Sequence, residues 1–361
     1  MTDASKVGLG IVGCGGAAVP VAQALAGSGV ARLAAVYDRN TELARDLGAS
    51  YGVPCAGSFD ALLTNPAVQA VYIAVPHDQL APLARQALEA GKHALVEKPM
   101  ALTLADADAL IALAEARGLA LGVFYELRHT SAHQQARALL QAGTLGAITG
   151  VRLQTLIDKA PDYWQRGPTG RTVSAWRASQ AQAGGGVVLM NTSHGLDAVR
   201  YLTGLEVTRI SGEIDTWTPG VEVEDTATAA LRYDNGAVGS LIAGAHLAGA
   251  DRDEATDLYG TQGQMRLPDP YGPGPLRVFL RQAWGDLGAG VWHSLPQTPV
   301  NAYARAMDDF AQAVQRDLPA PTSGRDARAV LAIVLGLYQA AATHSVVAVS
   351  STENEVNLAR P

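Results

Sequence analysis

The chain has 361 residues, of which 48% are hydrophobic and 17% charged, and it carries a formal net charge of −7 with a pI near 5.6. This length predicts about two domains, and the acidic balance argues against a nucleic-acid partner, because phosphate binding requires a basic surface. The two cysteines, Cys14 and Cys55, can form neither a disulfide framework nor a zinc site, so no metal is expected.

The first 125 residues alternate short apolar runs with helical patterns, which is typical of a parallel α/β sheet. Thr41, Ser58 and Thr103 are expected to cap the helices that follow them. The expected strands are Val7–Val12, Leu33–Tyr37, Ala70–Val75, His93–Val96 and Leu119–Phe124. The expected helices are Ala18–Ala26, Glu42–Tyr51, Leu80–Ala90 and Leu104–Arg117, with a short one after Ser58.

Residues 126–361 follow a different pattern, in which apolar runs succeed one another with little helix between them. This pattern indicates an α+β domain on an open, mainly antiparallel sheet. The expected strands are Ile148–Ile157, Glu206–Thr216, Ala227–Tyr233, Ala237–Ala245, Thr256–Tyr259, Gln264–Leu267, Leu276–Arg281 and Val346–Val349. The expected helices are Ser131–Ala142, Val187–Leu202, Asn301–Arg316 and Arg325–Thr343, and a loop is expected over Lys159–Ala183.

The N-terminus up to Lys6 is short and polar and lacks the apolar segment of a signal peptide. The most apolar late stretch, Ala329–Val349, is interrupted by Gln339, Thr343 and His344, so it is interpreted as a buried helix followed by a strand. We therefore expect a cytoplasmic protein without a membrane partner.

A glycine-rich turn follows the first expected strand and opens a helix, which is the context that makes such a turn informative. Gly13 permits a tight turn, Gly15 lets the backbone approach a pyrophosphate, and Ala18 is small enough for close helix–strand packing. Gly16 and Ala17 complete the turn at a helix N-terminus, whose free N–H groups favour phosphate. The turn predicts that the first domain is a dinucleotide-binding Rossmann domain.

Asp38 ends the second expected strand, about 20 residues past the glycine turn. Its carboxylate would accept hydrogen bonds from a ribose diol and repel a 2′-phosphate, so NAD is the expected cofactor. Arg39 is adjacent and could turn toward a 2′-phosphate, which keeps NADP as the alternative.

Two further motifs end later strands of the parallel sheet, whose carboxyl ends line a cofactor cleft. Val75, Pro76 and His77 are expected to border the nicotinamide ribose, although a plain helix-initiating loop explains His77 equally well. Glu97 and Lys98 precede a proline, which favours the extended backbone of a strand end. The Lys98 amine beside bound nicotinamide could act in acid–base catalysis. Glu97 could pair with Lys98 or hold the ribose. From spacing alone, a surface ion pair between Glu97 and Lys98 is equally consistent.

Three glycines at 184–186 precede a stretch that contains Met190, Asn191, His194 and Asp197. In an α-helix these four side chains share one face. A lone histidine among apolar residues is usually a satisfied core residue, but a polar stripe directly after three glycines favours a binding site.

These residues in this order resemble the Gfo/Idh/MocA oxidoreductase family, which includes glucose–fructose oxidoreductase and inositol dehydrogenases. The resemblance covers nearly the whole chain. It rests on the glycine turn, the segment Gly91–Pro99, Trp176-Arg177 before the triple glycine, His194, and a Gly-Thr-x-Gly turn at Gly260–Gly263.

The resemblance implies a Rossmann domain at 1–125 that binds NAD(P), and a second domain at 126–361 whose open sheet often packs against another subunit, as in a homodimer or homotetramer. It implies a sugar or polyol substrate between the domains. Lys98 is then the general acid/base, and His194 holds or helps to deprotonate the reacting hydroxyl. Substrate contacts are implied for Tyr125, Arg128, Trp176, Arg177, Met190 and Asn191.

Three positions depart from the family pattern: Met190 stands where many members carry an aspartate, His77 replaces an asparagine, and Leu80 replaces a histidine. The expected reaction is hydride transfer between NAD and a secondary alcohol of a sugar, cyclitol or related polyol. Two alternatives stay open. One is an NAD-using lyase, epimerase or glycosidase that works through a transient keto intermediate, and the other is a non-enzymatic NAD(H)-binding regulator.

Overall fold

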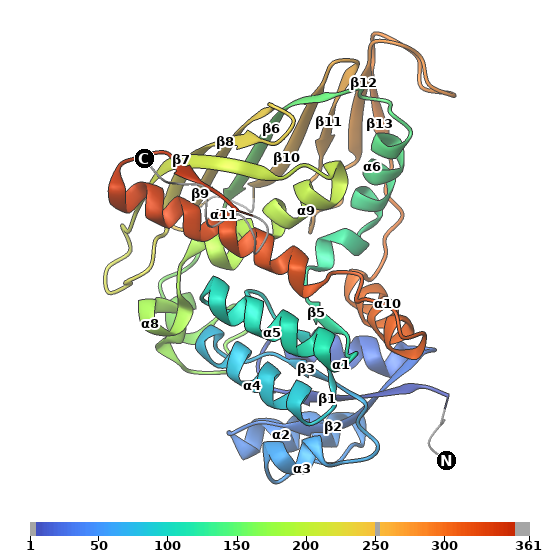
Figure 1. The fold of residues 1–361 in the computed structure, drawn as a ribbon, viewed down its shortest axis with the longest axis vertical. Helices are drawn as coiled ribbons and strands as arrows, with labels where there is room; N and C mark the ends of the chain where they lie inside the picture. Colours follow the sequence, from blue (N-terminus) through green and yellow to red (C-terminus); the bar gives the residue numbers. More distant parts are fainter. Residues whose placement is uncertain (1–4, 250–252, 351–361) are drawn as a thin grey trace. The chain divides into compact units, whose positions relative to one another are not determined.

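The computed structural model describes residues 5–249 and 253–350, and the chain divides into two compact units (Figure 1). The first unit comprises Met1–Glu126, Asp162–Gly184 and Asn301–Arg328, and the second comprises Leu127–Pro161, Gly185–Val300 and Ala329–Pro361. Each unit is thus assembled from several segments, whereas the division expected at residue 125 is contiguous. The cofactor and substrate roles expected for the two parts stay predictions.

A five-stranded parallel sheet forms the centre of the first unit, as the sequence predicted. The strands lie in the order β2-β1-β3-β4-β5, so β1 pairs with both β2 and β3. Strand order reverses at this point, and open α/β sheets bind their ligands there, beyond the carboxyl ends of the strands. The strands are β1 (Val7–Val12), β2 (Ala31–Tyr37), β3 (Ala70–Ile73), β4 (His93–Val96) and β5 (Leu121–Val123).

The helices of the first unit lie close to their predicted positions. The side chains of Ser58 and Thr103 cap α3 and α5, as predicted. The loop expected after residue 159 contains three short helices, α7, η2 and α8. The helices of this unit are α1 (Ala18–Gly27), α2 (Thr41–Tyr51), α3 (Phe59–Leu63), α4 (His77–Glu89), α5 (Leu104–Ala116), α7 (Tyr163–Arg166), η2 (Ala175–Ala178), α8 (Gln180–Ala183) and α10 (Ala302–Gln315).

Two predicted helix starts are wrong. The cap of α2 is Asn40, whose side chain accepts a hydrogen bond from the Glu42 N–H at 3.0 Å, while Thr41 is already helical. Asparagine is among the best N-cap residues, so the local sequence allowed both readings. Helix α4 begins at His77 instead of Leu80, because Pro76 lacks an N–H and fits directly before a helical turn.

A nine-stranded sheet forms the centre of the second unit, in the order β13-β12-β11-β10-β6-β9-β8-β7-β14. Neighbouring strands are antiparallel except β6 and β9, which confirms the predicted mainly antiparallel sheet. The strands are β6 (Ile148–Leu156), β7 (Val207–Asp215), β8 (Thr226–Tyr233), β9 (Val238–Gly244), β10 (Asp253–Gly260), β11 (Gly263–Leu267), β12 (Leu276–Leu280), β13 (Trp292–Leu295) and β14 (Val347–Ala348).

Strand β13 was not predicted, because its side chains are half-buried or exposed and show no apolar alternation. Helices α6 (Ser131–Gln141), α9 (Ser193–Thr203) and α11 (Gly324–Thr343) accompany one face of the nine-stranded sheet (Figure 1). On β9, buried Leu241 alternates with Val238 and Ile242, which are 51% and 46% exposed. The second face therefore presents apolar side chains to solvent. No helix formed by the described residues is long and apolar enough to cross a bilayer.

Candidate active site

The glycine turn lies where strand order reverses in the parallel sheet. Gly13 has a φ of +91°, and its N–H donates to the carbonyl of Tyr37 at 2.9 Å. A Cβ atom at this position would overlap the backbone carbonyl of Ala74, which follows β3. Only glycine therefore fits at position 13, since both its φ and the close approach of β3 exclude a side chain.

The start of α1 has the properties of a phosphate site. Ala17 is its N-cap residue, and no side chain among the described residues caps the helix. Gly15 and Gly16 are half-buried and Ala17 is exposed, whereas Ala18 is fully buried against the sheet. The uncapped N–H groups of the first turn can bind an anion, and this cradle fits the pyrophosphate of a dinucleotide.

Asp38 is fixed beside this turn at the end of β2. Its Oδ2 accepts the Cys14 N–H at 2.7 Å, and its Oδ1 accepts the Asn40 N–H at 2.7 Å. A carboxylate oxygen has a second lone pair, so both oxygens can also accept from ribose hydroxyls. Asp38 is half-buried, and the neighbouring Arg39 is exposed. The carboxylate is thus held in place by the chain itself, and its remaining lone pairs suit the hydroxyls of a ribose diol.

Glu97 and Lys98 directly follow β4, as predicted. The Glu97 N–H donates to the carbonyl of Ile73 at 2.9 Å, and the Tyr72 hydroxyl donates to Glu97 Oε1 at 2.6 Å. Glu97 Oε2 accepts the Lys98 N–H at 3.2 Å. Burial, and next the charge of Glu97, raise the pKa of Tyr72 well above its ordinary value, so its hydroxyl remains a donor. This pair fixes the backbone that carries Lys98.

Tyr72 was missed by the sequence analysis, although a signal was present. It is the one residue with a side-chain polar atom in β3, Ala70–Ile73, and it is fully buried. A buried tyrosine hydroxyl needs a hydrogen-bond partner, and Glu97 directly follows β4, the strand next to β3. Recognising this partner required the strand order, which the sequence pattern does not contain.

The structure brings His77 and Trp176 together within the first unit. The ring centroids are 4.6 Å apart at an interplanar angle of 60°, and His77 Nδ1 lies 2.8 Å from the carbonyl oxygen of Ala183. The guanidinium of Arg177 lies over the Trp176 ring at 4.5 Å and over the Tyr163 ring at 5.6 Å. Residues predicted to border cofactor and substrate are thus neighbours beyond the carboxyl end of β3.

In the second unit, the stretch after the three glycines differs from the prediction. Instead of one α-helix over Val187–Leu202, Val188–Thr192 forms a π-helical turn and α9 begins at Ser193. The predicted continuous α-helix is therefore wrong, and the single face predicted for Met190, Asn191, His194 and Asp197 stays a prediction, because α-helical spacing does not apply unchanged across this turn.

Glu224 explains the start of this segment. Its carboxylate accepts the N–H groups of Gly186 at 2.6 Å and Val188 at 2.9 Å, and the Tyr338 hydroxyl at 2.9 Å. A Cβ atom at Gly186 would overlap the backbone carbonyl of Glu224. Burial raises the pKa of Glu224 although these hydrogen bonds oppose the shift. Gly186 is therefore required for the close approach of Glu224, which lies two residues before β8. Glu224 is a positioning residue that the sequence analysis missed.

Around the π-helical turn, Met190 and His194 are buried at 5% and 9% exposure. The Lys159 ammonium donates to the side-chain oxygen of Asn191 at 2.6 Å. Lys159 was also missed; its signal was the scarcity of lysine, since the chain has only Lys6, Lys92, Lys98 and Lys159. Lys159 provides a positive charge beside the position where many family members carry an aspartate.

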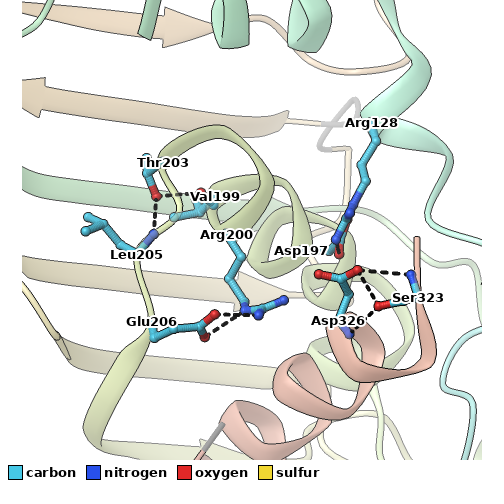
Figure 2. A network of polar contacts seen from close by, with 9 residues as sticks. All are labelled: Arg128, Asp197, Val199, Arg200, Thr203, Leu205, Glu206, Ser323 and Asp326. Carbon is cyan, nitrogen blue, oxygen red and sulfur yellow. Dashed lines mark hydrogen bonds and ion pairs between the residues drawn. The ribbon is translucent and has the colours of Figure 1, made fainter. Parts of the chain in front are cut away.

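Arg128 forms a two-pronged ion pair with Asp197, which is fully buried on α9 (Figure 2). Its Nε donates to Oδ2 at 2.7 Å and its Nη2 to Oδ1 at 2.5 Å. Figure 2 also shows Arg200 paired with Glu206 just past the end of α9. Arg128 therefore anchors the helix that carries His194, while its predicted contact with substrate stays a prediction. Tyr125 lies in the first unit and is buried.

Comparison with known proteins identifies both parts of the chain. Residues 7–125 match an oxidoreductase family with an NAD-binding Rossmann fold, and residues 133–266 match the GFO/IDH/MocA C-terminal domain. A 1,5-anhydro-D-fructose reductase of Ensifer adhaerens is 28% identical over 327 residues, which cover 89% of this chain and 91% of that relative. A myo-inositol 2-dehydrogenase of Thermotoga maritima is 25% identical, with 91% and 93% covered.

A levoglucosan dehydrogenase solved with NADH and levoglucosan has the same fold, with a TM-score of 0.86 over 96% of this chain and 100% of that chain. The sequence identity is 23%, so this likeness concerns the fold alone.

Proposed function

The chain belongs to the Gfo/Idh/MocA oxidoreductase family, and from this premise we propose that it transfers hydride between NAD and a secondary alcohol of a sugar, cyclitol or related polyol. One observation carries the proposal. The uncapped start of α1 lies at the strand-order reversal of the parallel sheet, the carboxylate of Asp38 is fixed beside it, and Lys98 follows the end of β4 in the same sheet. The known activities of the relatives, a sugar reductase and an inositol dehydrogenase, support the substrate class.

In the proposed mechanism, the backbone of the glycine turn binds the pyrophosphate and Asp38 binds the adenine ribose diol. NAD, when bound, supplies the hydride acceptor. Lys98 takes the hydroxyl proton as the carbon–hydrogen bond breaks, and His194 holds the reacting oxygen. Tyr72 and Glu97 keep the Lys98 backbone in place through the hydrogen bonds described above.

The residues also support NAD over NADP. The Asp38 carboxylate, which already accepts two backbone N–H groups, would repel the negative charge of a 2′-phosphate beside it. Arg39 follows directly and is exposed, so its guanidinium could turn toward a 2′-phosphate, which keeps NADP as the alternative.

One observation favours a second candidate function. Met190 stands in place of an aspartate, and Lys159 bonds the adjacent Asn191, so the polar groups around His194 differ from the family pattern. The loss of a carboxylate beside His194 favours a non-enzymatic NAD(H)-binding regulator as the second candidate. An NAD-using lyase, epimerase or glycosidase that works through a transient keto intermediate is the further alternative.

The experiment is a panel of sugars, cyclitols and their lactone or keto forms, incubated with purified protein and NAD or NADH. We expect stoichiometric NADH formation from an alcohol substrate or its reverse from a ketone. Product formation without net NADH would favour the transient-redox enzyme. Tight NAD binding with no turnover of any panel member would favour the regulator and contradict the proposed dehydrogenase.

We also propose that the exposed face of the nine-stranded sheet pairs with a second copy of the chain. Val238 and Ile242 present apolar surface there, which is costly in water. Light scattering on the wild type and on Ile242→Lys tests this: the variant should shift the mass toward a monomer, whereas an unchanged oligomer would place the contact elsewhere.

A further inference from the structure

A loop of the first unit lies against the glycine turn. Residues 166–173, here called the strap, leave helix α7 and return to it, because the Ser174 N–H donates to the carbonyl of Gln165 at 2.7 Å. A compact surface loop whose ends meet in this way is an Ω-loop, a type that often carries function. Gly170, near its tip, has a φ of +65°, a conformation that favours glycine.

Three side chains of the strap contact the turn. Arg171 Nε donates to the carbonyl of Cys14 at 3.0 Å. The Thr172 methyl group lies 3.5 Å from the place where a Cβ of Gly15 would stand, and a Cβ at Gly16 would overlap the hydroxyl of Thr169. The strap thus lies over the same two glycines whose missing side chains allow a pyrophosphate to approach the backbone.

The chemistry of the strap matches what the turn lacks. The glycine turn offers N–H groups but no cationic side chain of its own, and Asp38 beside it adds a negative charge. A guanidinium is the side chain best suited to a pyrophosphate, because its fork of N–H groups binds phosphate oxygens in pairs. Arg171 uses Nε on the Cys14 carbonyl, which orients the two terminal nitrogens of its fork.

We propose that the strap closes over the pyrophosphate of the bound dinucleotide, with Arg171 as its charged contact and Thr169 and Thr172 as flanking contacts. The strap opens to admit the cofactor and slows its release. This inference rests on the proposed NAD-dependent function, but it concerns cofactor retention and not the chemical step. A purely structural loop would instead affect the stability of the first unit and leave nucleotide affinity unchanged.

The test compares Arg171→Met with Arg166→Met, a matched control that removes the same charge from an exposed position at the base of the strap. NADH affinity is measured by fluorescence titration and NADH release by stopped-flow displacement. Arg171→Met should weaken NADH binding about tenfold and speed release by a similar factor, as expected for one charge-assisted contact. Arg166→Met should bind and release NADH as the wild type does, and Arg171→Lys should recover part of the loss.

Competition with fragments locates the contact. ADP carries the pyrophosphate and adenosine lacks it, so Arg171→Met should weaken the competition of ADP and leave that of adenosine unchanged. Circular dichroism and thermal unfolding establish that the variants are folded.

Three results would contradict the proposed role of the strap in binding the pyrophosphate. NADH and ADP binding equal to the wild type in folded Arg171→Met would make the loop structural only. Tighter NADH binding would mean that the loop occupies the phosphate position and obstructs it. Equal weakening of ADP and adenosine would place Arg171 at the nucleoside. In each case a wild type that binds NADH leaves the proposed function standing, whereas a wild type that binds no NADH removes both.

Discussion

The glycine turn of the first unit is formed mainly by backbone groups, whereas the π-helical turn of the second unit is held by side chains. The first consists mainly of backbone groups of consecutive residues, and its nearest side-chain partner, Asp38, comes from the next strand. The second depends on side chains that arrive from Lys159, Glu224 and Tyr338. A site of backbone atoms is specified by its local sequence, whereas a site of side chains exists only after distant segments have packed.

The largest effect is expected at Lys98, whose backbone N–H is held by Glu97 and whose amine is proposed to act as the general acid/base. Lys98→Met should lower kcat by a factor of roughly 10²–10⁴, the range for loss of a general acid/base. NADH titration should show unchanged affinity. A variant with near wild-type kcat on the true substrate would refute the assigned role.

The side-chain-built region should be the more fragile of the two. Removing Arg128 leaves the fully buried Asp197 charge without its two-pronged partner, so Arg128→Met should lower the free energy of unfolding by about 3–5 kcal/mol. Chemical denaturation of the wild type and the variant measures this loss in the free energy of unfolding. The control is Arg325→Met, whose pair with Glu115 is more than half exposed and should contribute little. Equal losses in both variants would show that burial does not make the Arg128–Asp197 pair more important to stability than the exposed Arg325–Glu115 pair.

Asp38 tests the backbone-built region. Asp38→Ala should weaken NAD binding by about 1–3 kcal/mol, because it removes hydrogen bonds to a charged acceptor. Asp38→Asn keeps an acceptor for the Cys14 N–H and should keep the turn while losing the charge. Calorimetry with NAD and NADP measures the cofactor affinities of both variants and of the wild type. A wild type that binds NADP much more tightly than NAD would show that the role assigned to Asp38 is wrong.

The stability of the π-helical turn should depend on pH through Glu224. The pKa of Glu224 is raised in the folded state above its ordinary 4.5, so its stabilising contribution is full below pH 4.5 and is lost as pH rises through the folded pKa. Glu224→Gln cannot titrate, so its free energy of unfolding should fall less over that interval than that of the wild type. Parallel curves for the two proteins would mean that Glu224 is not buried as described.

The smallest effect is expected at the thiol inside the glycine turn. Burial, and next the charge of Asp38, raise the pKa of Cys14 to about 12, so near neutral pH it is a thiol that donates to the Tyr37 carbonyl. Iodoacetamide at pH 8 should therefore label exposed Cys55 and leave Cys14 unmodified, as mass spectrometry can show. Rapid labelling of Cys14 in folded protein would show that the turn opens.

The sequence by itself determined the features that depend on neighbouring residues. The parallel sheet follows from apolar runs alternating with helical patterns, the glycine turn from its spacing after β1, and the position of Lys98 from the end of β4. The tertiary structure decided the rest. Tyr72 and Glu97 meet because β3 and β4 are adjacent. The carboxylate of Glu224 holds the backbone N–H groups at the start of the π-helical turn, and Arg171 reaches the glycine turn through a loop far along the chain. Local patterns record backbone preference and burial, but they carry no record of which distant side chain fills a given hydrogen-bonding position, because only the packed chain brings the two together.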